Sequence, residues 1–403
     1  MLRISLKSIS ALVFMSVILA CTKDDIELIE GPDMIINVQQ PPLSDSNKTV
    51  PTSDFEKSIL WIENMQSNNG LLESSENTDF VSLYDNSLAA LVFIELKQLD
   101  RAERIFDFFQ GKINSELLNN NGGFYQFRNS LGENGSRTWM GDNAWLLIAL
   151  NKYHEITENN KYQQMAYELD EWLRSLQDSD GGLWGGYNEN GTVIPKVTEG
   201  MITAFNAVKG YDDFHKNILV FLENNRWDTT NKFLVAWPEN PEYNHALDLH
   251  SLGGLILKGY SPENLMQAER FLNTQISTVN GLEISGYCFD EDKDVVWLEG
   301  TAQMATAHKF LNNNSIAEEL LIELEKSFIN SALISNAKGI PYTTNNGTNF
   351  GSEMLWNHAD LAPTLSATAW YIFAKKGFNP LGLNEEKEIP SAEKFWIAET
   401  SIN

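Results

Sequence analysis

The chain is poor in cysteine and in basic residues. Its 403 residues include 2 cysteines, Cys21 and Cys288, and Cys21 lies in a leader-like segment, so no internal disulfide is expected. Cys288 is expected to be a buried, small apolar group. Lys and Arg number 29 against 55 Asp and Glu, for a formal net charge of -26. Such a chain is not expected to bind nucleic acid, and a neutral or weakly charged substrate suits it better than a polyanion.

The signatures of several enzyme classes are also missing. We find no nucleophile elbow, Walker loop or dinucleotide fingerprint. The histidines are scattered, which argues against a zinc site. Asp290, Asp292 and Asp294 have the spacing of the first three ligands of a calcium loop, but Val295 stands where that loop needs glycine and no acid follows at its last position. We therefore expect a solvated acidic loop and predict no metal and no cofactor.

The N-terminus has the features of a targeting signal. Arg3 and Lys7 precede the apolar stretch 11–20, which is too short to span a bilayer as a stable helix. The Ile-Leu-Ala-Cys sequence at 18–21 resembles the lipobox of bacterial lipoproteins, which implies cleavage before Cys21 and acylation of that residue. Residues 1–20 are then the signal peptide, and the polar segment 21–52 is a tether. An ordinary signal peptide with an incidental cysteine is the alternative.

The rest of the chain alternates between helices and loops. We predict helices at 53–66, 84–97, 100–113, 142–153, 160–177, 198–208, 211–224, 245–258, 261–274, 294–311, 315–334 and 360–375. The odd-numbered helices of this series, counted from 53–66, have a polar stripe along one face. The even-numbered helices, counted from 84–97, are apolar nearly all round and must be buried on all sides. This alternation predicts an all-α fold, an (α/α)6 toroid of six helical hairpins with an inner and an outer ring. The toroid would span residues 53–380, and 381–403 would be a tail of unassigned role.

The predicted loops alternate in length in the same way. Outer-to-inner connections are long and inner-to-outer connections are short, so the long loops should gather above the N-termini of the inner helices. The glycine turns at 66–71 and 177–183 repeat, and Trp370-Tyr371 is followed by Asn379-Pro380. With these features the chain resembles the six-hairpin glycosidase-like proteins, which implies a carbohydrate-active enzyme. The same toroid serves polysaccharide lyases, sugar epimerases and terpenoid cyclases, so the fold alone gives no single activity.

Carboxylates recur where the inner helices are predicted to begin. The pair Asp85-Asn86 and Asp142-Asn143 and the pair Glu199-Gly200 and Glu299-Gly300 occupy matching points of the repeat. Asp248 and Asp360 lie near two further helix starts, and Asp360 is expected to be only a helix cap. Any single acid there can cap free backbone N–H groups. A ring of helices, however, brings the N-termini together, and like charges at close range raise one another's pKa.

That arrangement suits glycoside hydrolysis, which needs a protonated and an ionised carboxyl group. Asp142 and Glu199 are the predicted acid and base, in an order left open, with Asp85 and Glu299 in reserve. Glu299 is expected to be deeper in its helix or turned aside. Glycines beside Asp142 and Glu199 would leave space for a ligand. The wide cleft that the resemblance implies has room for a water between the carboxylates, so inversion is expected.

Aromatic residues crowd the long loops and suit the apolar faces of sugar rings. The predicted substrate-binding residues are Trp139, Arg137, Tyr84, Trp184, Tyr187 and Trp356. The hypothesis is therefore a monomeric, lipid-anchored glycoside hydrolase of the bacterial envelope, with the membrane face open. It would act on a neutral or weakly charged oligo- or polysaccharide.

Two other classes of function stay open. A polysaccharide lyase or sugar epimerase would use a neutral base and a group that neutralises a uronate. Tyr125, Arg128, His245 and His250 are the candidates for these roles. A non-enzymatic glycan-binding lipoprotein would need the tryptophans but not the acids.

Overall fold

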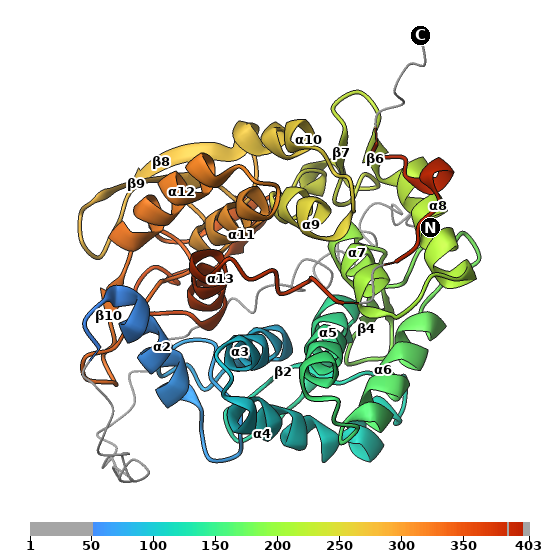
Figure 1. Ribbon diagram of the computed structural model, residues 1–403, viewed down its shortest axis with the longest axis horizontal. Helices are drawn as coiled ribbons and strands as arrows, with labels where there is room; N and C mark the ends of the chain where they lie inside the picture. Colours follow the sequence, from blue (N-terminus) through green and yellow to red (C-terminus); the bar gives the residue numbers. More distant parts are fainter. Residues whose placement is uncertain (1–50, 385–386, 398–403) are drawn as a thin grey trace, which may run out of the picture.

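The computed structural model describes residues 51–384 and 387–397 as a closed double ring of helices (Figure 1). The predicted signal peptide, the predicted acylation site Cys21 and most of the predicted tether lie outside these residues. Within them, no helix is both long and apolar enough to cross a membrane. The inner helices are α3, Leu83–Glu95; α5, Met140–Thr157; α7, Thr198–Ala207; α9, Asp248–Ile256; α11, Leu298–Phe310; and α13, Leu365–Lys376. The outer helices are α2, Asp54–Met65; α4, Leu99–Gln110; α6, Gln163–Ser175; α8, Asp213–Asn225; α10, Pro262–Met266; and α12, Asn314–Lys326.

The two rings follow from the burial pattern of the sequence. Each inner helix packs against the next around the ring, and α13 closes the ring on α3. Nearly every residue of an inner helix is buried, whereas α2, α4, α6, α8 and α12 bury one face against their inner neighbours. A helix without a polar face is stable only when it is surrounded on all sides. The (α/α)6 toroid predicted from the sequence is therefore the fold of the protein.

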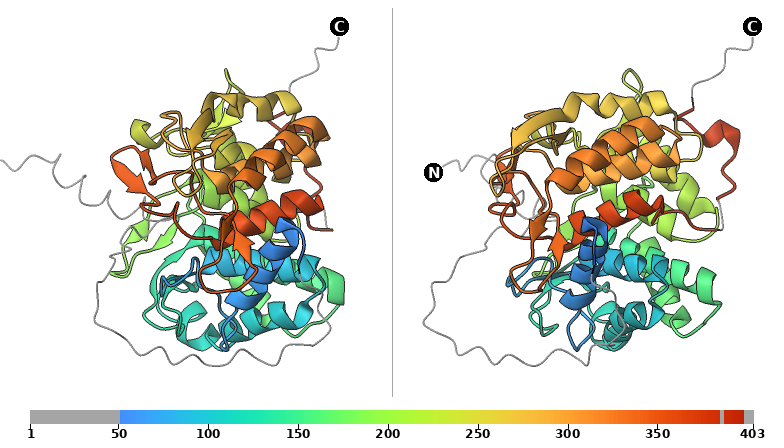
Figure 2. Two further views of the ribbon diagram at one scale, coloured as in Figure 1. Left: turned by 90° about the vertical axis from the view of Figure 1, so that its left-hand side faces the viewer. Right: turned by 60° about the vertical axis from the view of Figure 1, so that its left-hand side comes forward.

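The long loops and short strands gather at the end where the inner helices begin (Figure 2). Three of these loops build one antiparallel sheet from β1, Val81–Ser82; β2, Tyr125–Arg128; β3, Ser136–Trp139; β4, Gly186–Tyr187; and β5, Val193–Ile194. The other strands form two-stranded hairpins: β6, Trp227–Asp228, with β7, Phe233–Leu234; β8, Leu272–Ile276, with β9, Glu283–Tyr287; β10, Ile329–Asn330, with β11, Lys338–Gly339; and β12, Thr348–Phe350, with β13, Glu353–Leu355. None of these strands was predicted.

Repeated polar residues fix these loops to the helices. The amide of Asn86 bonds both the N–H and the carbonyl of Leu72, each at 3.0 Å. Asn143 holds Phe124 in the same way, at 2.8 and 3.0 Å. In each repeated Asp-Asn pair, the asparagine therefore anchors the preceding loop, and the aspartate remains available for the site.

Four predicted helix boundaries are wrong. The 261–274 helix stops at Met266, and a 3-10 turn, Gln267–Phe271, leads into strand β8. The 294–311 helix begins only at Leu298, because the Asp294 carboxylate accepts hydrogen bonds from Thr348 and Asn349 in another loop. The 315–334 helix stops at Lys326.

The fourth boundary concerns the last inner helix. Helix α13 begins at Leu365 with Thr364 at the N-cap position, so Asp360 is not the cap that was expected. Asp360 is buried before the helix, and its Oδ1 has no hydrogen-bond partner.

The tail packs on the end of the toroid opposite the long loops. Trp396 is 2% exposed, and its indole N–H donates to the Lys258 carbonyl at 3.2 Å. The Asn206 side chain donates to the Leu381 carbonyl at 3.0 Å. The described part of the segment predicted as a separate tail is therefore joined to the helical body.

Candidate active site

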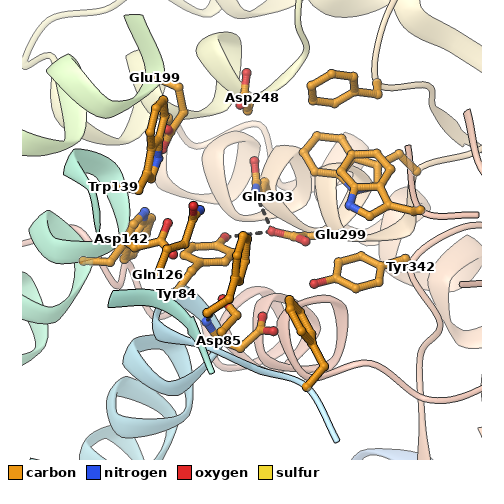
Figure 3. A pocket seen from close by; sticks show the side chains of 18 residues that line it. Tyr84, Asp85, Gln126, Trp139, Asp142, Glu199, Asp248, Glu299, Gln303 and Tyr342 are labelled. Atoms are coloured by element: carbon orange, nitrogen blue, oxygen red, sulfur yellow. Dashed lines mark hydrogen bonds between the residues drawn. The ribbon is translucent and has the colours of Figure 1, made fainter. Parts of the chain in front are cut away.

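Five consecutive inner helices each place a carboxyl group in one pocket. Asp85 and Asp142 are the third residues of α3 and α5, Glu199 and Glu299 are the second residues of α7 and α11, and Asp248 is the first residue of α9. All five line the same pocket at the long-loop end of the ring, and Figure 3 shows them around it. The sixth inner helix contributes Ser366, whose hydroxyl donates to Glu299 Oε2 at 2.7 Å.

The two aspartates that the sequence pairs are not helix caps. The Ser82 hydroxyl accepts from the backbone N–H of Asp85 and caps α3. Helix α5 follows Trp139, which makes no side-chain cap. Asp85 and Asp142 therefore present their carboxyl groups to the pocket instead of to their own helix ends.

Glu199 lies against the first turn of α5. A Cβ atom added to Gly141 would come within 2.9 Å of Glu199 Oε2 and 2.8 Å of the Trp139 indole nitrogen. The side chain of Glu199 thus occupies the space that the sequence suggested was left for a ligand. At Gly200, an added Cβ would meet the Met140 methyl group at 2.6 Å, so that glycine allows α5 and α7 to pack closely. These contacts place Glu199 next to the turn that carries Asp142.

Burial and mutual repulsion raise the pKa values of these acids. Burial raises the pKa of Asp142 to about 7, although the Arg137 guanidinium opposes the rise. Burial, together with repulsion by Asp248 and Asp142, raises the pKa of Glu199 to about 8. Burial also raises the pKa of Asp248 to about 7. Three carboxyl groups can therefore hold or release a proton near neutral pH, as general acids and bases must.

Asp85 is the acid most strongly held in its neutral form. It is 1% exposed, and neither of its oxygens accepts a hydrogen bond of normal geometry. Burial places its pKa well above the ordinary value, and the nearby Ser74 and Ser366 hydroxyls offset this only in part. A carboxyl group in this state is a hydrogen-bond donor rather than a charged base.

Glu299 has a different role from the others because its oxygens are occupied. Its Oε1 accepts from the Tyr84 hydroxyl at 2.7 Å and from the Gln303 amide at 3.2 Å, beside the Ser366 bond to Oε2. The Tyr84 hydroxyl in turn accepts from the Trp370 indole at 2.8 Å. The prediction that Glu299 is deeper or turned aside is wrong, since it lies in the first turn of α11 and lines the pocket. Burial raises the pKa of Glu299, which these donors oppose only in part, and the three hydrogen bonds hold the carboxyl group in one orientation.

Of the other predicted binding residues, three line the pocket and three do not. Trp139, Tyr84 and Trp356 are part of its wall. Arg137 lies behind the wall, where its Nε donates to Gln126 at 2.6 Å. Trp184 is 38% exposed under the Lys196 ammonium, and Tyr187 lies on β4 opposite Thr138. Neither Trp184 nor Tyr187 lines the pocket.

The alternative base candidates also lie elsewhere. Arg128 is buried in a bidentate ion pair with Glu116, with both N–O distances 3.0 Å. Tyr125 packs its ring against Gly135. His245 pairs with Glu291 at 3.1 Å, and His250 is buried beside two phenylalanines with its pKa lowered to about 3. None of the four lines the pocket.

Several lining residues were not singled out from the sequence. Gln126, Trp145, Leu252, Trp297 and Gln303 belong to this group. Phe289 and Tyr342 are among the loop aromatics expected from the sequence to contact sugar rings, and with Trp297 they form an aromatic wall around Trp356. Trp356 stacks on both Trp297 and Tyr342, with ring planes 10° apart in each pair. Gln303 could have been found, because it lies four residues after Glu299 on one helix face. Gln126 carries no such signal, since it reaches the pocket from strand β2.

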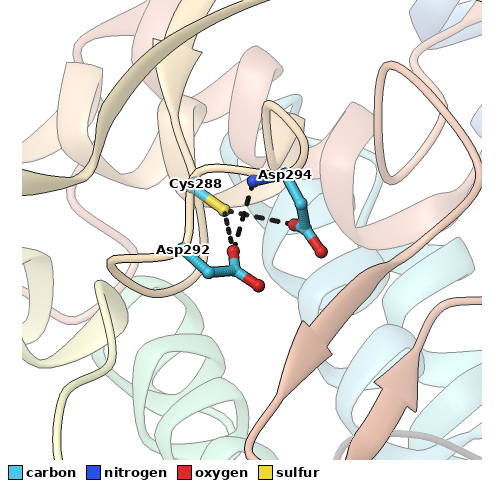
Figure 4. Close-up of side chains that lie close together, drawn as sticks. All are labelled: Cys288, Asp292 and Asp294. Carbon is cyan, nitrogen blue, oxygen red and sulfur yellow. Dashed lines mark hydrogen bonds between the residues drawn. The ribbon is translucent and has the colours of Figure 1, made fainter.

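The acidic loop before α11 is a structural cluster (Figure 4). The Cys288 sulfur lies 3.6 Å from Asp292 Oδ1 and 3.7 Å from Asp294 Oδ1. Burial raises the pKa of the Cys288 thiol to about 11, which agrees with an unreactive buried side chain. Asp294 is held by the loop that contains β12 and is not the solvated acid that we expected.

Comparison with solved structures identifies the fold. A novel alpha-amylase from Clostridium perfringens aligns over 82% of this chain and 100% of its own, with 12% identity and a TM-score of 0.59. A cellobiose 2-epimerase from Bacillus thermoamylovorans aligns over 80% of this chain and 98% of its own, with 12% identity and a TM-score of 0.55. A glycosidase in complex with glucose aligns over 82% of this chain and 96% of its own, with 12% identity and a TM-score of 0.53. No family model and no curated protein sequence matches the chain. The protein thus has the six-hairpin glycosidase-like fold, on which both glycosidases and sugar epimerases occur.

Proposed function

We propose that the protein is a glycoside hydrolase that acts on a neutral or weakly charged oligo- or polysaccharide. The observation that carries the proposal is the placement of Asp142 and Glu199 in adjoining first turns of α5 and α7, within an aromatic-walled pocket. Their pKa values, raised to about 7 and about 8, allow one to be protonated while the other is ionised.

The surroundings of the two groups support one assignment of their roles. Arg137 favours the ionised form of Asp142, whereas the charges of Asp248 and Asp142 favour the protonated form of Glu199. Glu199 is then the general acid that protonates the leaving glycosidic oxygen, and Asp142 is the base that removes a proton from the attacking water. With a water between the two carboxyl groups, the reaction inverts the anomeric configuration. Glu299 holds the Tyr84 hydroxyl in place beside them.

A screen of glycans with the soluble chain from residue 22 tests the proposal. Reducing-sugar release and absorbance near 235 nm are read together, and NMR gives the anomer first formed. We expect new reducing ends without absorbance. On the substrate found, Asp142→Asn and Glu199→Gln should each lower kcat about a thousandfold, within the range for loss of a general acid or base. Full activity in either variant, with folding verified by circular dichroism, would contradict the proposal.

The same screen separates the two alternatives. An absorbing product indicates a lyase, and a sugar isomerised without release of reducing ends indicates an epimerase. Binding without any turnover indicates a glycan-binding protein. The absence of Tyr125, Arg128, His245 and His250 from the pocket lining favours the hydrolase over the lyase or epimerase that those residues would have served.

We also propose that Cys21 is acylated and anchors the protein in a bacterial envelope. The lipobox-like sequence at 18–21 is its support. Expression with a radiolabelled fatty acid should label the wild-type chain and leave Cys21→Ser unlabelled. Equal labelling of both chains would refute this assignment.

A further inference from the structure

The ionisable carboxyl groups of the pocket can carry charge of one sign only, which is negative. The pocket lining includes the five carboxyl groups of Asp85, Asp142, Glu199, Asp248 and Glu299, and no Lys, Arg or His. The Arg137 side chain is turned to Gln126 and to the face of Phe127, with its guanidinium carbon 5.4 Å from the ring centroid. A ligand in the pocket therefore meets acids, amides and aromatic rings, and its own positive charge would find partners on several sides.

Several of these acids also have buried oxygens that accept no hydrogen bond. Both oxygens of Asp85, Oδ2 of Asp142 and Oδ1 of Asp248 accept no hydrogen bond of normal geometry. Asp85 and Asp142 are 1% and 6% exposed, and Asp248 is partly buried. Buried acceptors without donors are costly, and a ligand that supplies N–H or O–H groups removes that cost. Glu299 differs, because three protein donors already saturate it.

A metal ion does not fit this arrangement. Among the residues that the structure describes, the set of three metal-ligating side chains with ligand atoms within 4.8 Å of one another is Cys288, Asp292 and Asp294, which lies outside the pocket. The pocket acids come from five different helices and face one another across a wider space (Figure 3). An organic cation with several N–H donors can reach such separated acceptors.

The walls of the pocket fit the rest of such a ligand. Trp297, Trp356 and Tyr342 form a stack, and Tyr84 contacts the Trp145 ring edge-on at a centroid distance of 5.5 Å. Aromatic faces bind both the C–H faces of sugars and positive charge. The carboxyl groups can bind a cation and the aromatic wall can bind the face of a sugar ring, so together they fit a sugar that carries an ammonium group.

We infer that the pocket prefers an amino sugar with a free, protonated amine, an unacetylated hexosamine unit, over the corresponding neutral, N-acetylated or acidic sugar. The inference rests on the proposed function only in taking the ligand to be a sugar. The ammonium group would lie among Asp85, Asp142 and Asp248 and donate to their unpartnered oxygens. An acetyl group would remove the charge, and a uronate would add a further negative charge.

Calorimetry on the full-length chain in detergent tests this preference. Glucosamine, glucose, N-acetylglucosamine and glucuronate are compared at pH 7, where Asp142 and Asp248 are partly ionised, together with the galacto- and manno-configured counterparts of the first two. We expect at least one amino sugar to bind ten times or more tighter than its hydroxyl counterpart. Equal or tighter binding of the hydroxyl or N-acetyl sugars, or no binding of any amino sugar, would overturn the inference.

Variants and buffers sharpen the test. Asp248→Asn keeps the shape of the side chain but removes a carboxyl group that can ionise near pH 7, so it should reduce the amine preference severalfold. The exposed Glu171→Gln should leave the preference unchanged. The titratable groups facing the ammonium are the five carboxyls, Tyr84 and Tyr342. Because a cation favours ionised carboxyls, binding of the amine at pH 7 should release protons, seen as a heat that varies with buffer ionisation enthalpy. No proton release and an unaltered preference in Asp248→Asn would contradict the proposed site.

The two proposals can fail separately. Hydrolysis of neutral glycans without an amine preference would refute the substrate class and leave the hydrolase standing. An amine preference without hydrolysis of any amino-sugar glycoside would leave the binding site standing and refute the hydrolase.

Discussion

The carboxyl group of Glu199 should make the stability of the fold depend on pH. Its pKa rises from 4.5 to about 8, because burial disfavours the charged form and because Asp248 and Asp142 repel it. The folded chain therefore keeps a proton on Glu199 that the unfolded chain loses above its ordinary pKa. This group's contribution to stability is complete below pH 4.5 and is lost progressively as the pH rises to about 8.

The size of the effect follows from the size of the shift. Each pKa unit corresponds to about 1.4 kcal/mol, so the full difference between 4.5 and about 8 amounts to about 5 kcal/mol, of which about 4 kcal/mol is reached by pH 8. Glu199→Gln has no titrating proton at this position, so its free energy of unfolding should not fall with pH for this reason. The free energy of unfolding of the variant, minus that of the wild type, should therefore become more positive by about 4 kcal/mol between acidic pH and about pH 8.

Urea unfolding monitored by circular dichroism at a series of pH values measures this difference. Glu171→Gln, an exposed substitution on outer helix α6, is the matched control and should show a flat difference over the same range. If the Glu199→Gln difference is also flat, Glu199 is ionised in the folded protein, and the reasoning from burial and repulsion is refuted. Its role as general acid at neutral pH would then lose its basis.

Three further predictions concern the surroundings of the pair. Arg137→Gln removes the cation that lowers the pKa of Asp142, so the acidic limb of the kcat profile should move to higher pH; an unmoved limb would show that Arg137 does not act on Asp142. Glu299→Gln replaces one of the two accepting oxygens by an NH2 donor, so at least one buried donor loses its acceptor; this should lower the free energy of unfolding by about 1–3 kcal/mol, more than Ser366→Ala, which removes one donor. A smaller loss for Glu299→Gln in denaturant titrations would contradict this account. Trp356→Ala removes the middle ring of the aromatic stack and should raise KM on the identified substrate more than it lowers kcat, and an unchanged KM would exclude that wall from the binding site.

The double ring could be predicted because its signal is distributed over whole helices. A segment such as 140–157 is apolar on every face, so only full burial can stabilise it. The loop strands have no such signal, since strands of two to four residues are too short to show alternation. Strands β8 and β9 have five residues each, and in β8 Leu272, Thr274 and Ile276 alternate with Asn273 and Gln275. That period of two argued against the helix predicted there.

The acids of the pocket could be predicted in part for a related reason. The repeats of Asp-Asn and Glu-Gly mark equivalent points of successive hairpins, so a ring places them together. The start of α11 was misplaced because Asp294 is typical of a helix cap, and the sequence does not show that a distant loop binds its carboxylate. Placing the start at Leu298 gives Glu299 the same position as Glu199, two residues into the first turn.

The protonation of these acids follows from their convergence in the ring, as expected from the sequence, and not from the position of each acid on its own helix. At the N-terminus of a helix, the aligned backbone N–H groups favour an ionised carboxylate and so lower its pKa. Had each acid acted alone, Asp142 and Glu199 would both be ionised at neutral pH and neither could serve as an acid. The pKa values rise instead because five first turns converge, which removes water from the carboxyl groups and brings like charges together. Acid–base chemistry in this pocket is therefore a property of the closed ring and not of any single helix.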